Sequence, residues 1–246
     1  MMNLSQAGIE ANEVVDWLKK ELQIQPILQN ILHQKIIAKT AGERGVTVSD
    51  EEIQAEGDRF RLEYRLEKAS DTLAWLAERT ISANEWEAGI RDRLLKKKLA
   101  VALFDKEVEK FFAEHRLEFD KILLYQIIVP YEKVAREVLY QIEEQEISFY
   151  EAAHLYDMDE RRRLLCGCEG KIPRSRLQPD IAPAVFSTPL HEIVGPLKTD
   201  LGYHLFLAEE LIRAELTSEI RQQIIDRLFA QWLSMELNYT LHNQQL

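Results

Sequence analysis

Hydrophobic residues recur with a helical period over the first 118 residues and again over the last thirty. Between Pro26 and Ala41, and in the long segment after Ser82, apolar side chains return every three to five positions, which is typical of helices that bury one face. Two capping boxes, Ser49-Asp50-Glu51-Glu52 and Ser82-Ala83-Asn84-Glu85, mark the starts of helices. The same pattern predicts a long amphipathic helix from Thr217 to Leu241.

Residues 119–212 follow a different pattern. Six of the seven prolines lie at or after Pro130, and the short apolar run Lys121–Val129 predicts a buried strand that ends at this proline. The remaining pattern predicts helices over 131–145, 148–156 and 181–186, a loop between the last two, and strands over 193–197 and 203–209. This order of elements predicts a small mixed α/β domain.

The two patterns together predict an α+β protein in which an all-helical lobe surrounds the mixed domain in sequence. We expect boundaries at 1–118 for the helical lobe, 119–212 for the α/β domain and 213–246 for a C-terminal helix. The apolar stripe of the C-terminal helix is wider than the small α/β domain would cover. We therefore expect this helix to pack against the first lobe. The stripes of the first lobe fit either a closed core or a surface that binds other polypeptides.

Charge and composition exclude several classes of protein. The chain has 42 acidic and 31 basic side chains, a formal net charge of −11, which argues against a nucleic-acid partner. No run approaches the ~20 apolar residues that would predict membrane insertion. The first eight residues show neither a basic start nor an apolar run, so we expect no signal peptide and a cytoplasmic location.

The only two cysteines, Cys166 and Cys168, are one residue apart. A disulfide framework is therefore excluded, and the pair fits a reducing compartment. A thiol–disulfide pair or half of a soft-metal site is one interpretation, and ordinary loop residues are the other. Four-coordinate zinc needs two more ligands, and no second pair of this kind exists, so we predict no metal.

Several runs of the middle segment resemble the parvulin-type peptidyl-prolyl isomerase domain. The most specific is Val194–His204 (VGPLKTDLGYH), which resembles the final hairpin of that family; the others are Leu124–Val129 (LYQIIV), Phe149–Ala153 (FYEAA), Gly167–Gly170 and Ala184–Phe186. In the first lobe, Gly45–Ile53 (GVTVSDEEI) resembles a motif of the chaperone group that includes SurA, PrsA and trigger factor. These resemblances imply a parvulin-like domain inserted into a chaperone-like helical lobe.

The resemblance also implies a site in which apolar walls hold a proline ring and hydrogen bonds favour the twisted amide. Rotation about an X–Pro bond faces a barrier of about 18–20 kcal/mol, and lowering it requires no nucleophile, metal or cofactor. Matched position by position, His204 is the second of two floor histidines, Thr199 its supporting hydroxyl, and the walls are Leu177, Ile181 and Phe186.

Two positions depart from the family pattern. Gln126 stands where the first floor histidine is expected, and the position facing the substrate carbonyl is Glu160, or Asp159 if the loop shifts by one residue. A glutamine donates and accepts hydrogen bonds, but with a geometry different from that of imidazole. His204 also fits a buried histidine that closes a hairpin, and Gln126 an inward polar residue that needs a partner wherever it lies.

Six basic residues crowd sixteen positions that contain one acid, Glu169; they are Arg161, Arg162, Arg163, Lys171, Arg174 and Arg176. They fit a solvated loop, or a rim beside the pocket that attracts acidic segments. In the second case Arg161, Arg162 and Arg163 bind substrate.

The sequence thus favours a peptidyl-prolyl cis-trans isomerase with a chaperone lobe, weakly active because of Gln126 and Glu160. Its expected partner is an unfolded or extended polypeptide that contains proline, and no oligomeric state is predicted. The alternative is a non-catalytic chaperone or peptide-binding adaptor that uses the parvulin domain for binding alone.

Overall fold

The computed structural model describes residues 8–243. Contacts within the chain divide it into two compact units: one combines the chain up to Val108 with the residues from Arg221 onward, and the other comprises Glu109–Ile220. We call the first the helical unit and the second, which contains the segment that resembles parvulins, the parvulin unit. These limits differ by eight to ten residues from the boundaries expected at 118 and 212, and the expected domain division stays a prediction.

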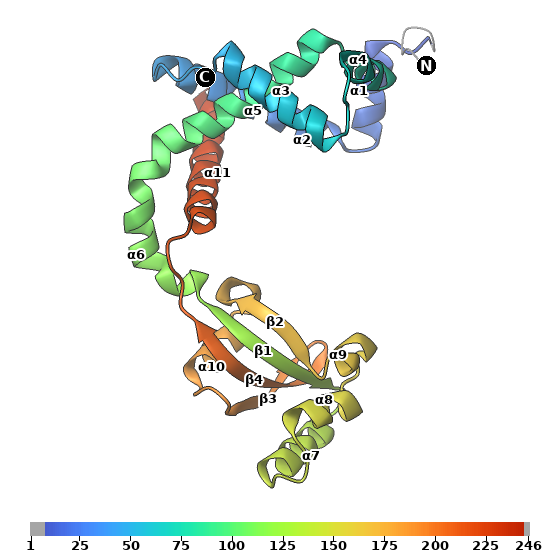
Figure 1. Cartoon of the computed structure of the whole chain (residues 1–246), viewed down its shortest axis with the longest axis vertical. Helices are drawn as coiled ribbons and strands as arrows, with labels where there is room; N and C mark the ends of the chain where they lie inside the picture. The colour runs from blue at the N-terminus through green and yellow to red at the C-terminus, as the bar shows by residue number, and fades with distance from the viewer. Residues whose placement is uncertain (1–7, 244–246) are drawn as a thin grey trace. The chain divides into compact units, whose positions relative to one another are not determined.

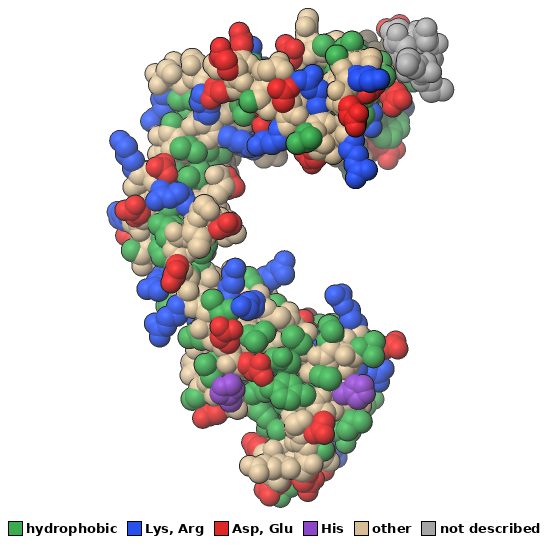
Figure 2. All heavy atoms as spheres, in the orientation of Figure 1, with side chains coloured by type: hydrophobic (Ala, Val, Ile, Leu, Met, Phe, Trp, Pro, Cys, Tyr) green, Lys and Arg blue, Asp and Glu red, His purple; other side chains and the backbone are tan. Residues whose placement is uncertain are grey.

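The helical unit contains long helices whose starts are encoded locally (Figure 1). Ser49 and Ser82 each accept a hydrogen bond from the backbone N–H three residues on, at 3.3 and 3.2 Å, and both predicted capping boxes are present. The helices are α1 (Ala11–Lys20), α2 (Ile24–Glu43), α3 (Asp50–Glu63), α4 (Ala69–Glu78), α5 (Ala83–Phe104) and α11 (Ser218–Asn243). Within residues 8–243, no helix is both long enough and apolar enough to cross a membrane. Acidic and basic side chains are interspersed over this unit (Figure 2).

The long stripe expected after Ser82 is not one continuous helix. A 3₁₀ turn, η1 (Asp105–Glu107), separates α5 from α6 (Val108–Phe119), and His115 within α6 departs from helical geometry at φ −120°. In a 3₁₀ turn, residues that are three positions apart lie on the same face, which is close to the spacing in an α-helix. The periodicity of the sequence therefore gives no sign of the break.

The parvulin unit is built on a four-stranded antiparallel sheet with the order β2-β1-β4-β3. The predicted strands and helices are confirmed as β1 (Lys121–Val129), α7 (Glu132–Glu143), α8 (Phe149–Tyr156), α10 (Ile181–Ser187), β3 (Ile193–Thr199) and β4 (Gly202–Ile212). The predicted loop was wrong in part, because it contains α9 (Glu160–Leu164), β2 (Cys168–Pro173) and the 3₁₀ turn η2 (Arg174–Arg176). These elements are too short to show a hydrophobic period in the sequence. Strand β2 is held in the sheet by its antiparallel pairing with β1.

Each face of the sheet has its own hydrophobic core. On one face, residues of β1 and β4 pack against α7 and α8; the buried members are Ile127, Val129, Ala135, Val138, Phe149, Ala152, Ala153, Leu205 and Leu207. On the other face α10 provides the cover, and the buried members are Ile122, Leu124, Ile181, Val185, Val194, Phe206 and Ala208. Strand residues alternate between the two cores, as the two-residue period of a strand requires. We call the second face the α10 face, and it carries the candidate site.

Two glycines explain the most specific motif of the sequence. Gly195 and Gly202 have φ angles of +135° and +134°, which side chains other than glycine rarely adopt. A Cβ atom at Gly195 would collide with the carbonyl oxygen of His204, and one at Gly202 with that of Val129. The β3–β4 hairpin therefore requires glycine at both positions, and this geometry fixes the backbone around His204.

Candidate functional site

Three polar side chains form a hydrogen-bonded chain at one end of the α10 face. Gln126 pairs with Phe206 across the sheet and Ile128 with His204, so Gln126 and His204 are diagonal neighbours on the same face. Gln126 Nε2 lies 2.8 Å from His204 Nδ1, and Thr199 Oγ1 lies 2.6 Å from His204 Nε2. The structure therefore brings together three of the residues that the sequence singled out.

His204 is buried, with 4% of its surface exposed. Burial lowers the pKa of His204 below its usual value of 6.5, the positive charge of Arg162 lowers it further, and the carboxylate of Asp157 partly opposes both. The ring is neutral at neutral pH, so one nitrogen donates a hydrogen bond and the other accepts one. Because Gln126 and Thr199 occupy both ring nitrogens, the neutral imidazole holds these two side chains in place.

The apolar side chains expected to form the walls lie on the same face. Ile181 is part of the buried core there, and Leu177 and Phe186 pack against it. The ring of Phe206 stacks on His204, with ring centroids 5.6 Å apart. The sequence analysis did not single out Phe206, although its position two residues after His204 in a strand places both side chains on one face.

Glu160 and Asp159 lie at the start of α9, next to the strand that carries Gln126. The backbone N–H of Met158 donates to Ile128 O at 2.9 Å and holds this segment against β1. Asp159 is the N-cap of α9, and its Oδ1 accepts the N–H of Arg162 at 2.8 Å. Within residues 8–243, Glu160 is exposed and makes neither a hydrogen bond nor an ion pair. Both oxygens of Glu160 are therefore open to a ligand, whereas Oδ1 of Asp159 is engaged at the N-cap.

A buried ion pair behind this loop was missed from the sequence. The Asp157 side chain has no exposed surface, and it accepts hydrogen bonds from Arg162 Nε at 2.7 Å and from the N–H of Ile128 at 3.0 Å. Arg162 also binds Glu169, with 2.9 Å between Nη1 and Oε1. Asp157 and Arg162 are only five residues apart, but the sequence does not show that their pair is buried, because the other partners, Ile128 and Glu169, lie in β1 and β2. It anchors the loop that presents Glu160.

The basic cluster therefore divides into two kinds of residue. The Arg162 side chain is only 16% exposed and is bound to two carboxylates, and the Arg174 guanidinium lies over the Phe186 ring. Arg161 is exposed, and Arg161 and Arg163 form no side-chain ion pair within the part of the chain described. Arg162 thus has a structural role, whereas the binding role expected of Arg161 and Arg163 stays a prediction.

Cys166 and Cys168 are free and half-buried. They flank Gly167, whose carbonyl accepts the N–H of Gln126 at 2.8 Å. Among residues 8–243, no group of three histidine, cysteine or acidic side chains is arranged to hold a metal ion. The segment thus contacts the strand that carries the site through the backbone of Gly167 and through the side chain of Cys168, which interacts with Tyr125 of β1.

We expect the stability of the parvulin unit to depend on the protonation of His204. Because the pKa of His204 is lowered in the folded state, the unfolded chain binds the proton more readily. Stability is therefore full above about pH 6.5, falls as the pH drops below that value, and levels off below the folded pKa. Amide exchange in β1, corrected for intrinsic rates, should show this slope, and His204→Gln should flatten it. An unchanged slope in the variant would assign it to other groups.

Comparison with known proteins shows which family the sheet-containing unit is similar to. Residues 129–210 match the rotamase family of PPIC-type PPIase domains. The chain therefore contains a parvulin-type peptidyl-prolyl isomerase domain, and the resemblance noted in the sequence is confirmed.

The particular proteins that the chain resembles over most of its length are PrsA foldases. It is 25% identical to foldase protein PrsA of Caldanaerobacter subterraneus over 81% of this chain and 60% of that protein. Identity to foldase protein PrsA of Halalkalibacterium halodurans is 27%, over 88% of this chain and 66% of the relative. The chain thus spans less than two thirds of the length of these two relatives.

Solved structures support the fold. The crystal structure of PrsA from Bacillus anthracis matches with a TM-score of 0.54 at 18% identity, covering 89% of this chain and 98% of that one. PrsA from Bacillus cereus matches with a TM-score of 0.52 at 18% identity, covering 97% and 89%. The predicted fold class, α+β with a helical chaperone-like part and a parvulin-like domain, is confirmed.

The expected cytoplasmic location was wrong. The PrsA foldases that this chain is similar to act outside the cytoplasm, which contradicts that expectation. The expectation rested on the composition of the first eight residues, and Met1–Ala7 lie outside the described residues.

Proposed function

We propose that this chain is a weakly active peptidyl-prolyl cis-trans isomerase whose helical unit acts as a chaperone. The observation that carries the proposal is the hydrogen-bonded chain Gln126–His204–Thr199 beside the apolar side chains of the α10 face. Its proposed substrate is an unfolded or extended polypeptide that contains proline. PrsA relatives support the isomerase and foldase classes.

In the proposed mechanism, Leu177, Ile181 and Phe186 hold the proline ring away from water. Loss of resonance on twisting makes the amide nitrogen more basic, so a site lowers the barrier by binding the twisted amide more tightly than the planar one. Neutral His204 fixes the polar end of the site, and Glu160 lies where it can interact with the substrate carbonyl. Arg161 and Arg163 attract acidic segments next to the proline.

We propose weak activity because two polar positions differ from the family pattern. The Gln126 amide keeps a hydrogen bond to His204, but it is less polarisable than imidazole and has another geometry. The side chain of Glu160 is longer than that of aspartate and is not held by any neighbour in the described structure. Both changes affect the preference for the twisted amide and leave the apolar walls intact.

A protease-coupled assay with a short Xaa-Pro peptide tests this proposal. We expect acceleration that is measurable only at high concentrations of the protein and that is well below the rate of a standard parvulin. Aggregation of an unfolded client should be suppressed at the same time. A rate equal to that of a standard parvulin would show that Gln126 and Glu160 do not limit turnover.

A second candidate is a peptide-binding adaptor without catalysis. The engagement of Gln126 with His204 favours it, because this amide is then less available to a twisted substrate. In that case proline peptides would bind, and the assay would show no acceleration at any concentration of the protein.

A further inference from the structure

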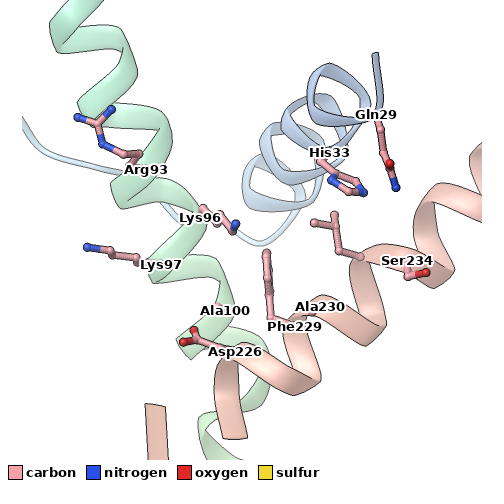
Figure 3. Close-up of a pocket in the computed structure, with 11 residues that line it drawn as sticks. Gln29, His33, Arg93, Lys96, Lys97, Ala100, Asp226, Phe229, Ala230 and Ser234 are labelled. Atoms are coloured by element: carbon pink, nitrogen blue, oxygen red, sulfur yellow. The ribbon is translucent and has the colours of Figure 1, made fainter. Parts of the chain in front are cut away.

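A cavity of about 580 Å³ lies within the helical unit, between α2, α5 and α11 (Figure 3). Its size falls in the range of sites that bind small molecules or short peptide segments. Buried apolar side chains form its inner surface, from Ala100, Phe229 and Leu233. The cavity is far in sequence from the proposed isomerase site and uses none of its residues.

Two polar groups enter this apolar space. Lys96 extends from α5 toward His33 of α2 and Phe229 of α11 (Figure 3). Among the described residues, His33 Nε2 is shielded from water and has no hydrogen-bond partner. Burial lowers the pKa of His33, and the charge of Lys96 lowers it further, so the ring is neutral and close to a cation. Buried polar atoms usually have partners, and His33 Nε2 therefore favours a ligand that supplies one.

The charges around the cavity favour an anion. Its lining contains Arg93, Lys96 and Lys97 against the single acid Asp226, in a chain whose net charge is −11. None of the three basic side chains forms an ion pair within residues 8–243, although the charges of Arg93 and Lys97 contribute to lowering the pKa of Glu56. In Figure 3 these two side chains point away from Phe229, which leaves Lys96 as the cation that faces the apolar surface.

We propose that this cavity binds an extended polypeptide segment in which a carboxylate side chain lies beside apolar side chains. Lys96 pairs with the carboxylate, Phe229 and Leu233 contact the apolar side chains, and His33 Nε2 bonds to the peptide backbone. The inference rests on the proposed chaperone function and assigns it a site and a substrate class. A fatty acid would fill the apolar part, but its single carboxylate would pair with Lys96 and leave His33 Nε2 without a partner; a peptide backbone offers donors and acceptors along its length.

Fluorescence anisotropy with three labelled ten-residue peptides tests the charge preference. All three lack proline and alternate leucine with Glu, Gln or Lys, and we expect the Glu peptide to bind most tightly. Lys96→Glu should lower the affinity for the Glu peptide at least fivefold and raise the affinity for the Lys peptide. The matched control is Lys35→Glu, an exposed lysine of α2 outside the cavity, which should change affinity less than twofold. Equal affinities for the three peptides, or equal losses in both variants, would overturn the proposal.

A second variant and a direct probe place the peptide in the cavity. Ala230 is exposed and lines the opening, so Ala230→Trp should fill the space without disturbing the core and abolish binding of the Glu peptide. The ring nitrogen resonances of His33, assigned with His33→Gln, should shift when the Glu peptide is added. If laurate shifts them and the peptide does not, the site binds a lipid and the proposal is wrong.

Isomerase assays on the same variants separate this inference from the proposed function. Lys96→Glu should leave turnover of an Xaa-Pro peptide unchanged, because Lys96 is in the helical unit. If the Glu peptide fails to bind while isomerase activity is present, the inference fails alone. If the Glu peptide binds as expected and no acceleration is found, the isomerase proposal fails and the cavity site stands.

Discussion

Replacing Arg162 by alanine is expected to lower the free energy of unfolding of the parvulin unit by about 3–5 kcal/mol, the cost of leaving a buried charge without its partner. The Asp157 carboxylate has no exposed surface, and Arg162 supplies two of its hydrogen bonds, from Nε and Nη2. The N–H groups of Ile128 and Asp159 remain as donors, but neither carries a charge. The loop that begins α9 should therefore loosen first.

Hydrogen exchange of the Ile128 amide measures this effect, because that amide donates to Asp157. Tryptophan fluorescence provides an internal control, since all four tryptophans lie in the helical unit, and its unfolding should not change. Arg161→Ala, at an exposed neighbour, should cost less than about 0.5 kcal/mol. Arg162→Lys should recover part of the loss, because it keeps the charge and loses the paired geometry. Equal effects of Arg161→Ala and Arg162→Ala would contradict the assigned role of the ion pair.

Removing the imidazole of His204 is expected to lower the isomerase rate about a hundredfold, which corresponds to ~3 kcal/mol of transition-state preference. The imidazole of His204 bridges Gln126 and Thr199, so His204→Ala removes a hydrogen-bond partner from each of these two side chains. The apolar walls are unchanged, so proline peptides should still bind. The loss should therefore appear in kcat more than in KM.

The reverse changes should increase the rate. Gln126→His restores the paired histidines of the family pattern, and Glu160→Asp shortens the carboxylate at the start of α9; we expect about tenfold from the two together, or ~1.4 kcal/mol. Leu62→Ala, an exposed residue of α3 in the helical unit, is the control and should leave turnover unchanged. No response to His204→Ala, Gln126→His or Glu160→Asp would show that the site lies elsewhere.

Local chemistry made much of the fold predictable. The capping boxes at Ser49 and Ser82 satisfy backbone groups within four residues, so the starts of α3 and α5 can be read from the sequence. The run Lys121–Val129 is buried enough on both faces of the sheet to appear as a continuous apolar segment. Helix starts and a buried strand depend on residues that are neighbours in the chain, so the pattern of hydrophobic and polar residues is enough to predict them.

The candidate site was predictable only where a motif carried it. His204 and Thr199 belong to the hairpin motif, whose glycines have φ angles that few other residues adopt, and Gln126 follows from the position of β1. Phe206 was accessible from the alternation of β4 but was not singled out. The proposed roles of Glu160 and of Arg161 and Arg163 stay predictions.

The sequence by itself thus determined the helices, the principal strands and the parvulin hairpin, because backbone conformation and periodic burial are local properties. Only the tertiary structure decided that Arg162 is an internal partner of Asp157 rather than part of an open basic rim, and that His33 and Lys96 meet Phe229 at a cavity. Asp157 and Arg162 are only five residues apart, but strand β1 contributes to burying their pair, and the cavity residues come from three helices that are distant in the chain. Burial then changes the energy of a charge or a polar atom, and it depends on all the elements packed around that atom.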